Sequence, residues 1–113
     1  MVTPRIIHVG PAGWSYADWE GRVYPRPRPR GFHPLAYLAE YVDCVELNVT
    51  FYRTPSPHQV ARWAELVADR PRFRFLAKVG RLFTHETWSY VPLEEARAFR
   101  EAIAPLVEAG RLS

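Results

Sequence analysis

The sequence predicts an α/β fold that comprises the first three strand–helix units of a parallel (β/α)8 barrel, with the C-terminal half of the barrel absent from residues 1–113. Short β-branched or aromatic runs alternate three times with helical patterns, and such alternation requires parallel strands joined by crossover helices. The sequence ends after the third helix, whereas a closed α/β barrel takes about 250 residues. It also lacks the short glycine-rich first turn of a doubly wound sheet, which is the alternative architecture.

The first unit is predicted to contain a strand, a long loop and a helix. Residues 5–10 form a β-branched run closed by glycine, which is typical of a strand. Residues 10–31 contain several prolines, which exclude regular helix through most of the segment, and four aromatic residues that favour an ordered, packed loop. Residues 34–41 are predicted to form a helix, with Pro34 in its first turn.

The second unit follows directly. Residues 43–50 are predicted to form the second strand, and residues 57–68 the second helix. Ser56 is suited to cap this helix and Pro57 to occupy its first position. Apolar residues recur at three-and-four spacing along the helix, which indicates a buried face.

The third unit completes the pattern. Residues 73–79 are predicted to form a strand and residues 93–109 a helix, in which Pro105 should produce a kink or an end. Gly110 fits a helix C-terminal stop. A fourth strand should begin at residues 111–113.

Composition restricts the classes of function. The formal net charge of +3 is far from the dense basic stripe of a dedicated nucleic-acid binder. No run of about 18 apolar residues occurs, so no membrane span is predicted. Cys44 is the only cysteine, so an internal disulfide is impossible and a cytoplasmic location is expected. Lys78 is the only lysine; unlike arginine, a buried lysine can lose its proton and act as a base, although a GC-rich genome would explain the same arginine bias.

Three ordered motifs carry a family resemblance. They are Gly-Trp-Ser-Tyr at 13–16 followed by Trp19, Gly21 and Tyr24-Pro25; Val-Glu-Leu-Asn-Val-Thr-Phe-Tyr-Arg at 45–53; and Phe-Leu-Ala-Lys-Val at 75–79 with Thr84-His85. With these motifs the chain resembles the YecE-like family (domain of unknown function 72). The resemblance implies a TIM-barrel fold and a full-length domain more than twice as long as this chain. It implies no reaction, because the family has no established one.

Candidate catalytic residues lie where a barrel carries its active site, at the carboxyl ends of the strands and in the following loops. Alternation along the second strand places Glu46 and Asn48 on one face, which is expected to point into the barrel. Glu46 is then either a structural residue paired with an arginine or amide, or a base beside Asn48 as a polar anchor. Lys78 ends the third strand, where it could form a structural ion pair with Glu46, bind an anion or carbonyl, or act as a base. His85, in the third loop, is either solvated or directed at the same barrel mouth.

Candidate substrate-binding residues flank these groups. Trp14, Tyr16 and Trp19 could form an aromatic wall that stacks on a sugar or base, or a hydrophobic lid over the barrel. Tyr52 and Arg53 follow the second strand directly. Arg53 and the arginines of the first loop put positive charge on this side, which favours a phosphate- or carboxylate-bearing ligand.

The leading hypothesis is a TIM-barrel enzyme that acts on a small anionic or sugar-like substrate by acid–base chemistry. Glu46, Lys78 and His85 would be its catalytic residues. No metal site is predicted, since Glu46 and His85 lack diagnostic spacing, and no particular cofactor is indicated. The alternatives are a nucleic-acid-associated protein that holds a strand with the basic loop and the aromatic residues, and a truncated, non-functional fragment. An incomplete barrel leaves sheet edges open, so self-association is also expected.

Overall fold

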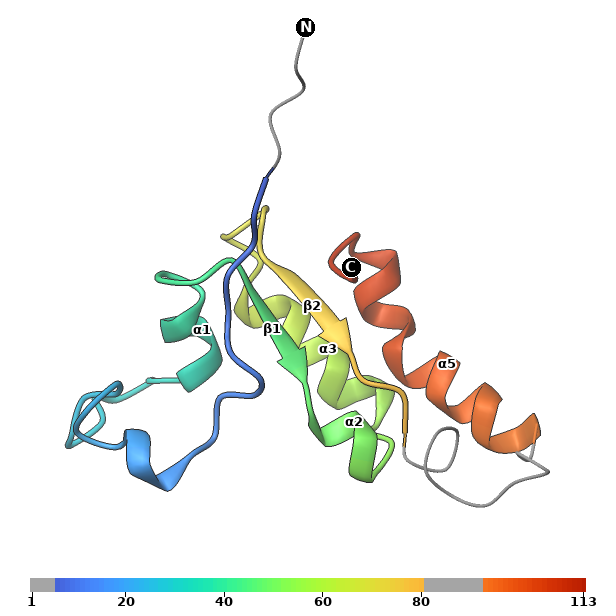
Figure 1. Ribbon diagram of the computed structural model, residues 1–113, viewed down its shortest axis with the longest axis horizontal. Coiled ribbons are helices and arrows are strands. Elements are labelled where there is room, and N and C mark those ends of the chain that lie inside the picture. The colour runs from blue at the N-terminus through green and yellow to red at the C-terminus, as the bar shows by residue number, and fades with distance from the viewer. Residues whose placement is uncertain (1–5, 81–92) are drawn as a thin grey trace, which may run out of the picture.

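The computed structural model describes residues 6–80 and 93–113, which form a mixed α/β arrangement around two parallel strands (Figure 1). Strands β1 (Cys44–Leu47) and β2 (Arg74–Ala77) pair with Glu46 opposite Leu76. Helices α3 (Pro57–Leu66) and α5 (Leu93–Glu108) pack against each other on one side of the strands. Helix α1 (Pro34–Leu38) lies on the far side of β1 from β2. The short helix η1 (Ala17–Trp19) precedes α1, and the short helix α2 (Val49–Tyr52) follows β1.

The chain before β1 runs parallel to that strand. The Asp43 amide donates to the Val9 carbonyl at 2.9 Å. The Gly13 amide donates to the Glu46 carbonyl at the same distance. Gly10 is required for this approach, because a Cβ atom there would lie 1.7 Å from the Cys44 carbonyl oxygen. Residues 6–10, the described part of the strand predicted at 5–10, do not form a strand: hydrogen bonding to the neighbouring segment begins only at Val9, and the β-bridge lies at Ala12.

The other end of the described chain pairs with β2. The Phe75 amide donates to the Arg111 carbonyl at 2.7 Å, and the Ser113 amide donates to the Phe75 carbonyl at 2.8 Å. This bridge is also parallel, in agreement with the fourth strand predicted to begin at residues 111–113. The paired segments of the described residues therefore lie in chain order: 9–13, β1, β2 and 111–113.

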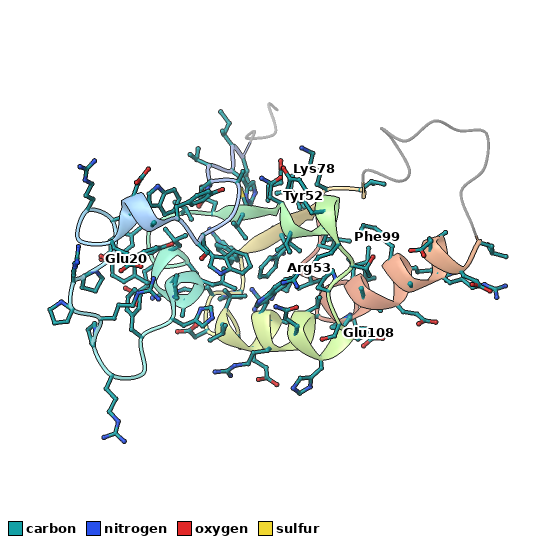
Figure 2. All side chains as sticks on the ribbon, turned by 90° about the horizontal axis from the view of Figure 1, so that it is seen from below. Glu20, Tyr52, Arg53, Lys78, Phe99 and Glu108 are labelled. Atoms are coloured by element: carbon teal, nitrogen blue, oxygen red, sulfur yellow. The ribbon has the colours of Figure 1, made fainter. Side chains whose placement is uncertain are left out.

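The core lies between the strands and the helices. Its fully buried members are Val45 and Leu47 of β1, Phe75 of β2, Val60 of α3 and Leu106 of α5. These side chains come from the apolar face of each strand and from the three-and-four spacing of each helix, as the sequence predicts. The opposite face of the strands is not covered by these helices (Figure 2).

The second strand is shorter than predicted. It ends at Leu47, and Asn48 adopts a right-handed helical conformation that starts α2, although residues 43–50 were expected to be extended throughout. Thr50 is consequently buried rather than part of a strand face. Its hydroxyl lies 2.7 Å from the Leu47 carbonyl oxygen and 2.6 Å from that of Lys78, so it connects the carboxyl ends of β1 and β2. This tertiary contact outweighs the β-propensity of the local sequence.

The helix ends follow their sequence signals with small differences. The Ser56 hydroxyl accepts a hydrogen bond from the Gln59 amide at 3.1 Å and caps α3, as predicted. The predicted 34–41 helix ends as α1 at Leu38. A kink or an end was predicted at Pro105, and helix α5 does not end there. The proline lies within the last turn, where its missing amide costs the helix a single hydrogen bond. Gly110 follows with a φ of +68°, which suits a helix stop.

His33 caps α1, a role that the sequence did not suggest. Its Nδ1 atom accepts a hydrogen bond from the Leu35 amide at 3.1 Å, which requires this nitrogen to be unprotonated. Burial is the main cause of a lowered pKa for His33. The neutral, capping form of the imidazole is therefore favoured in the folded chain.

The first loop is ordered by aromatic packing, as expected from its composition. Tyr24 is almost fully buried, and its hydroxyl donates to the Trp14 carbonyl at 2.5 Å. Burial raises the pKa of Tyr24 to about 12. The Arg28 guanidinium pairs with Glu20 and lies 5.6 Å and 5.4 Å from the ring centroids of Tyr24 and Phe32.

Among the described residues, no helix has the length and apolar character needed to cross a membrane.

Candidate functional site

The predicted site residues gather at the carboxyl ends of β1 and β2, and the sheet divides them into two groups. Since Val45 and Leu47 face the helices, Glu46 lies on the opposite, uncovered face. Figure 2 shows Tyr52 and Lys78 on this uncovered side and Arg53 on the side of α3. The turn at Asn48 produces this division, because it takes the chain out of the strand before the polar residues that follow.

On the side of α3, an open pocket of about 400 Å³ lies between the first loop, the end of β1 and the start of α3. We call it the helix-side pocket. Arg53 is the only charged side chain in the described part of its lining. Its aromatic residues are Trp14, Tyr16 and Trp63, its polar side chains are Ser15, Asn48 and Gln59, and it is completed by Gly13, Leu47 and Val49.

The first loop holds the aromatic wall of this pocket in place. Gly13 has a φ of +79°, a conformation that favours glycine, and its amide donates to the Glu46 carbonyl. The Trp14 ring meets Trp63 edge to face, with centroids 5.2 Å apart and an interplanar angle of 84°. The Tyr16 hydroxyl donates to the Ala12 carbonyl. Backbone and side-chain contacts thus fix the wall before any ligand is present.

The polar lining groups are not used to hold the fold together. Asn48 occupies the N-cap position of α2, yet its side chain makes no capping hydrogen bond. No carboxylate pairs with Arg53 in residues 6–80 and 93–113, whereas Arg28 and Arg62 are paired with glutamates. The Gln59 backbone amide binds the α3 cap and leaves its side-chain amide for other partners. This pocket therefore offers one cation and two amides to a ligand.

On the uncovered face, Glu46 and Lys78 lie on neighbouring strands. Glu46 pairs with Leu76, and Lys78 follows two residues later on the same face. With strands about 4.8 Å apart and a rise of about 3.3 Å per residue, their Cα atoms are about 8 Å apart, within reach of both side chains. The Lys78 amide lies 3.4 Å from the Leu47 carbonyl and donates to it, and the Thr50 hydroxyl binds the Lys78 carbonyl. The backbone of Lys78 is thereby anchored to the end of β1.

The hypothesis of a single pocket for all predicted groups has a mixed outcome. Trp14, Tyr16, Asn48 and Arg53 line the helix-side pocket, while Glu46, Tyr52 and Lys78 are not among its lining residues. His85 falls outside the described residues, so its role stays a prediction. In the described ranges, no three histidine, cysteine or acidic side chains gather in a way that could hold a metal ion.

The two pocket residues from α3 were not predicted as functional. Trp63 was assigned to the core by its helical spacing, and Gln59 was given no role. Gln59 lies in the first turn of the helix that follows β1. A crossover helix starts near the carboxyl end of the preceding strand, so this topological position was the signal that could have identified Gln59.

Comparisons with known proteins agree with the motifs of this chain. Residues 8–113 match the family model described as "Protein of unknown function DUF72". The UPF0759 protein YecE of Escherichia coli (strain K12) is 33% identical over 81 residues, which is 72% of this chain and 26% of that protein.

Two crystal structures of the same family are similar in fold. A DUF72 family protein (TM1631) of Thermotoga maritima MSB8 has a TM-score of 0.68 and 32% identity, covering 96% of this chain and 42% of that one. A DUF72 family protein (EF0366) of Enterococcus faecalis V583 has a TM-score of 0.61 and 29% identity, covering 69% and 32%. The chain thus spans less than half the length of these relatives.

Proposed function

The chain belongs to the DUF72 family, and from that premise we propose that it forms the N-terminal units of a TIM (β/α)8 barrel with its active site at the carboxyl ends of the strands. The order of the paired segments supports this, because 9–13, β1, β2 and 111–113 follow one another in parallel, as barrel strands do. The placement of α3 and α5 on one side of the strands also supports it. The relatives of known structure are longer, which leaves room for the remaining units.

The activity we propose is acid–base catalysis on a small anionic or sugar-like substrate. The observation that carries it is the placement of Glu46 and Lys78 on the same uncovered face, at the carboxyl ends of adjacent parallel strands. A carboxylate there can remove a proton from the substrate, and an ammonium group can stabilise the negative charge that develops. Tyr52 borders the same face and would position the substrate. His85 is proposed as the third reactive group.

The test uses the fact that Lys78 is the only lysine. Reductive methylation with ¹³C-formaldehyde labels only Lys78 and the amino terminus, and methylated lysine keeps its charge. We expect glucose 6-phosphate to shift the Lys78 signal in a saturable manner, with inorganic phosphate and glucose as comparison probes. Glu46→Gln should weaken this response, and Glu65→Gln, on the exposed face of α3, should leave it unchanged. A Lys78 signal that none of these probes moves would contradict the proposal.

The uncovered face also leads us to propose self-association of the isolated chain. Leu76, which pairs with Glu46, is about two fifths exposed there, and open strand edges favour pairing with another chain. Sedimentation velocity should detect oligomers that dissociate on dilution. A monodisperse monomer at high concentration would contradict this expectation.

A nucleic-acid-associated role is the second candidate. It is favoured by Arg22, Arg26 and Arg30, which are exposed on the same loop that carries the aromatic pair Tyr16 and Trp19. Binding of a single-stranded oligonucleotide that falls steeply with salt would support this role. Salt-insensitive or undetectable binding would exclude it.

A further inference from the structure

We infer that the helix-side pocket is a second binding site, separate from the Glu46–Lys78 face, for a planar ring that carries one anionic group, either a carboxylate or a phosphate. The inference goes beyond the proposed catalytic function and does not depend on it. It is drawn from the charge, the aromatic wall, the size and the position of the pocket.

The positive charge of the lining favours an anionic ligand. Among the described lining residues Arg53 is the only charged one, so no carboxylate of residues 6–80 and 93–113 opposes it in the pocket. It follows α2 with an extended backbone (φ −155°, ψ 156°) and is exposed to solvent. A guanidinium presents parallel N–H donors that match the two oxygens of a carboxylate or phosphate. An arginine without an ion-pair partner in the described ranges is available for this contact.

The aromatic wall of the pocket favours a ligand with a planar ring. Trp14 is half-buried and Tyr16 is 40% exposed, so both keep part of their surface for a ligand, while Trp63 is 6% exposed and supports the Trp14 ring by edge-to-face contact. Aromatic side chains bind flat, apolar groups by stacked or edge-to-face contact. The hydrogen bond from the Tyr24 hydroxyl to the Trp14 carbonyl limits the movement of the wall. Such preorganisation reduces the entropic cost of binding.

The size and the remaining polar groups agree with this ligand class. A volume of about 400 Å³ lies within the range of small-molecule sites, which is about 300–1,000 Å³. The side chains of Asn48 and Gln59 can both donate and accept hydrogen bonds, so they suit substituents on a ring. The described lining of the pocket therefore combines polar and aromatic side chains.

The position of the pocket separates it from the proposed catalytic face. Leu47 lines the pocket, and its neighbour Glu46 points to the other side of the same strand. Figure 2 likewise shows Arg53 and Lys78 on opposite sides of the sheet. A ligand in the pocket would not contact Lys78, and the two sites can be disabled independently.

Isothermal titration calorimetry with AMP, benzoate, adenosine and inorganic phosphate tests the inference. AMP, benzoate or both should bind at least about 10-fold more tightly than adenosine and phosphate, because only they combine a ring with an anion. Binding of AMP alone would assign the anion as a phosphate, and binding of benzoate alone as a carboxylate. Failure of both probes to bind more tightly than phosphate would overturn the inference.

Two matched variants locate the binding. Arg53→Gln should weaken binding of the ring anion by about 10-fold or more, as expected for a charged hydrogen bond. Arg62→Gln, which changes an exposed arginine of α3 outside the pocket lining, should leave the affinity unchanged, and so should Lys78→Gln. Equal losses of affinity in Arg53→Gln and Arg62→Gln would mean that the ring anion is held by non-specific electrostatic attraction. An unchanged affinity in Arg53→Gln would exclude the helix-side pocket as the binding site. Circular dichroism should show the same fold for all three variants, since these side chains are exposed.

Discussion

Replacement of Thr50 by valine removes the one hydroxyl that connects the carboxyl ends of the two strands. Thr50 is 1% exposed, and its hydroxyl lies within hydrogen-bond distance of the Leu47 and Lys78 carbonyls. Valine has nearly the same shape, so the packing around the side chain should change little. The effect of Thr50→Val is therefore expected to come from the lost hydrogen bond alone.

The magnitude follows from the groups that remain. The Leu47 carbonyl keeps the Lys78 amide as a donor at 3.4 Å, so the main loss falls on the Lys78 carbonyl. A fully buried carbonyl without a donor costs about 1–3 kcal/mol, and since the contact with the Lys78 carbonyl is part-buried, we expect a loss of about 1 kcal/mol. For a chain of this size, 1 kcal/mol corresponds to a decrease of about 4 °C or more in the melting temperature.

Urea denaturation followed by circular dichroism measures this cost, and the ¹³C signal of methylated Lys78 gives an independent readout. Thr50→Ser is the control: it keeps the hydroxyl and loses one buried methyl group, worth about 0.8 kcal/mol. We expect the Lys78 signal to move in Thr50→Val and to stay in place in Thr50→Ser. Wild-type stability in Thr50→Val, or equal displacement of the Lys78 signal in both variants, would refute the connecting role of Thr50.

Three further predictions concern the first loop and its neighbours. Because burial lowers the pKa of His33 in the folded state below its ordinary value of 6.5, stability should be greatest above that pH and fall as the pH decreases through the folded-state pKa. Urea titrations at several pH values should show this loss, and His33→Asn, which keeps a capping side chain, should reduce it. Gly10→Ala should lower the free energy of unfolding by about 2 kcal/mol or more, because the new Cβ would overlap the Cys44 carbonyl; an unchanged urea midpoint would disprove the close approach. Since the pKa of Tyr24 is raised to about 12, absorbance at 295 nm should show tyrosine still protonated above pH 11, and Tyr24→Phe should reduce this late ionisation, to which Tyr37, whose pKa is also raised, can contribute.

Local signals predicted the helices well. The Ser56 cap, the Pro57 start and the Gly110 stop are chemical features of single residues, so they can be recognised in the sequence without tertiary information. The three-and-four spacing of apolar residues also predicted the buried face of α3 and the burial of Leu106 in α5, whereas Val107, expected on the same face, is exposed. The parallel pairing of β1 with β2 followed from the alternation of strands and helices.

Strand positions were less predictable, because they depend on partners distant in the chain. Ile6 and Ile7 have high β-propensity, yet both are about four fifths exposed, and pairing with β1 begins only at Val9. Register is set by hydrogen bonds to the neighbouring strand, which a local pattern does not contain. In the same way, the early end of β1 depends on the contact of Thr50 with Lys78, 28 residues away.

The sequence identified several residues of the candidate site, but it did not predict how they are arranged in space. Aromatic and cationic residues next to a strand end identified Trp14, Tyr16 and Arg53, which do line one pocket. The division into two faces could not be predicted, since it results from the turn at Asn48. The strand ends three residues earlier than predicted, so the side chains after Leu47 no longer follow its alternation between the two faces.

The central claim is that the sheet separates a Glu46–Lys78 face from a ring-anion pocket beside Arg53. A single NMR experiment tests it most directly, with the ¹³C-methyl signal of Lys78 for the first site and the indole N–H signals of Trp14 and Trp63 for the second. We predict that whichever of benzoate and AMP binds will shift the indole signals and leave Lys78 in place, and that glucose 6-phosphate will shift Lys78. A ligand that moves both sets of signals together, with both responses lost in Arg53→Gln, would mean one site and contradict the account.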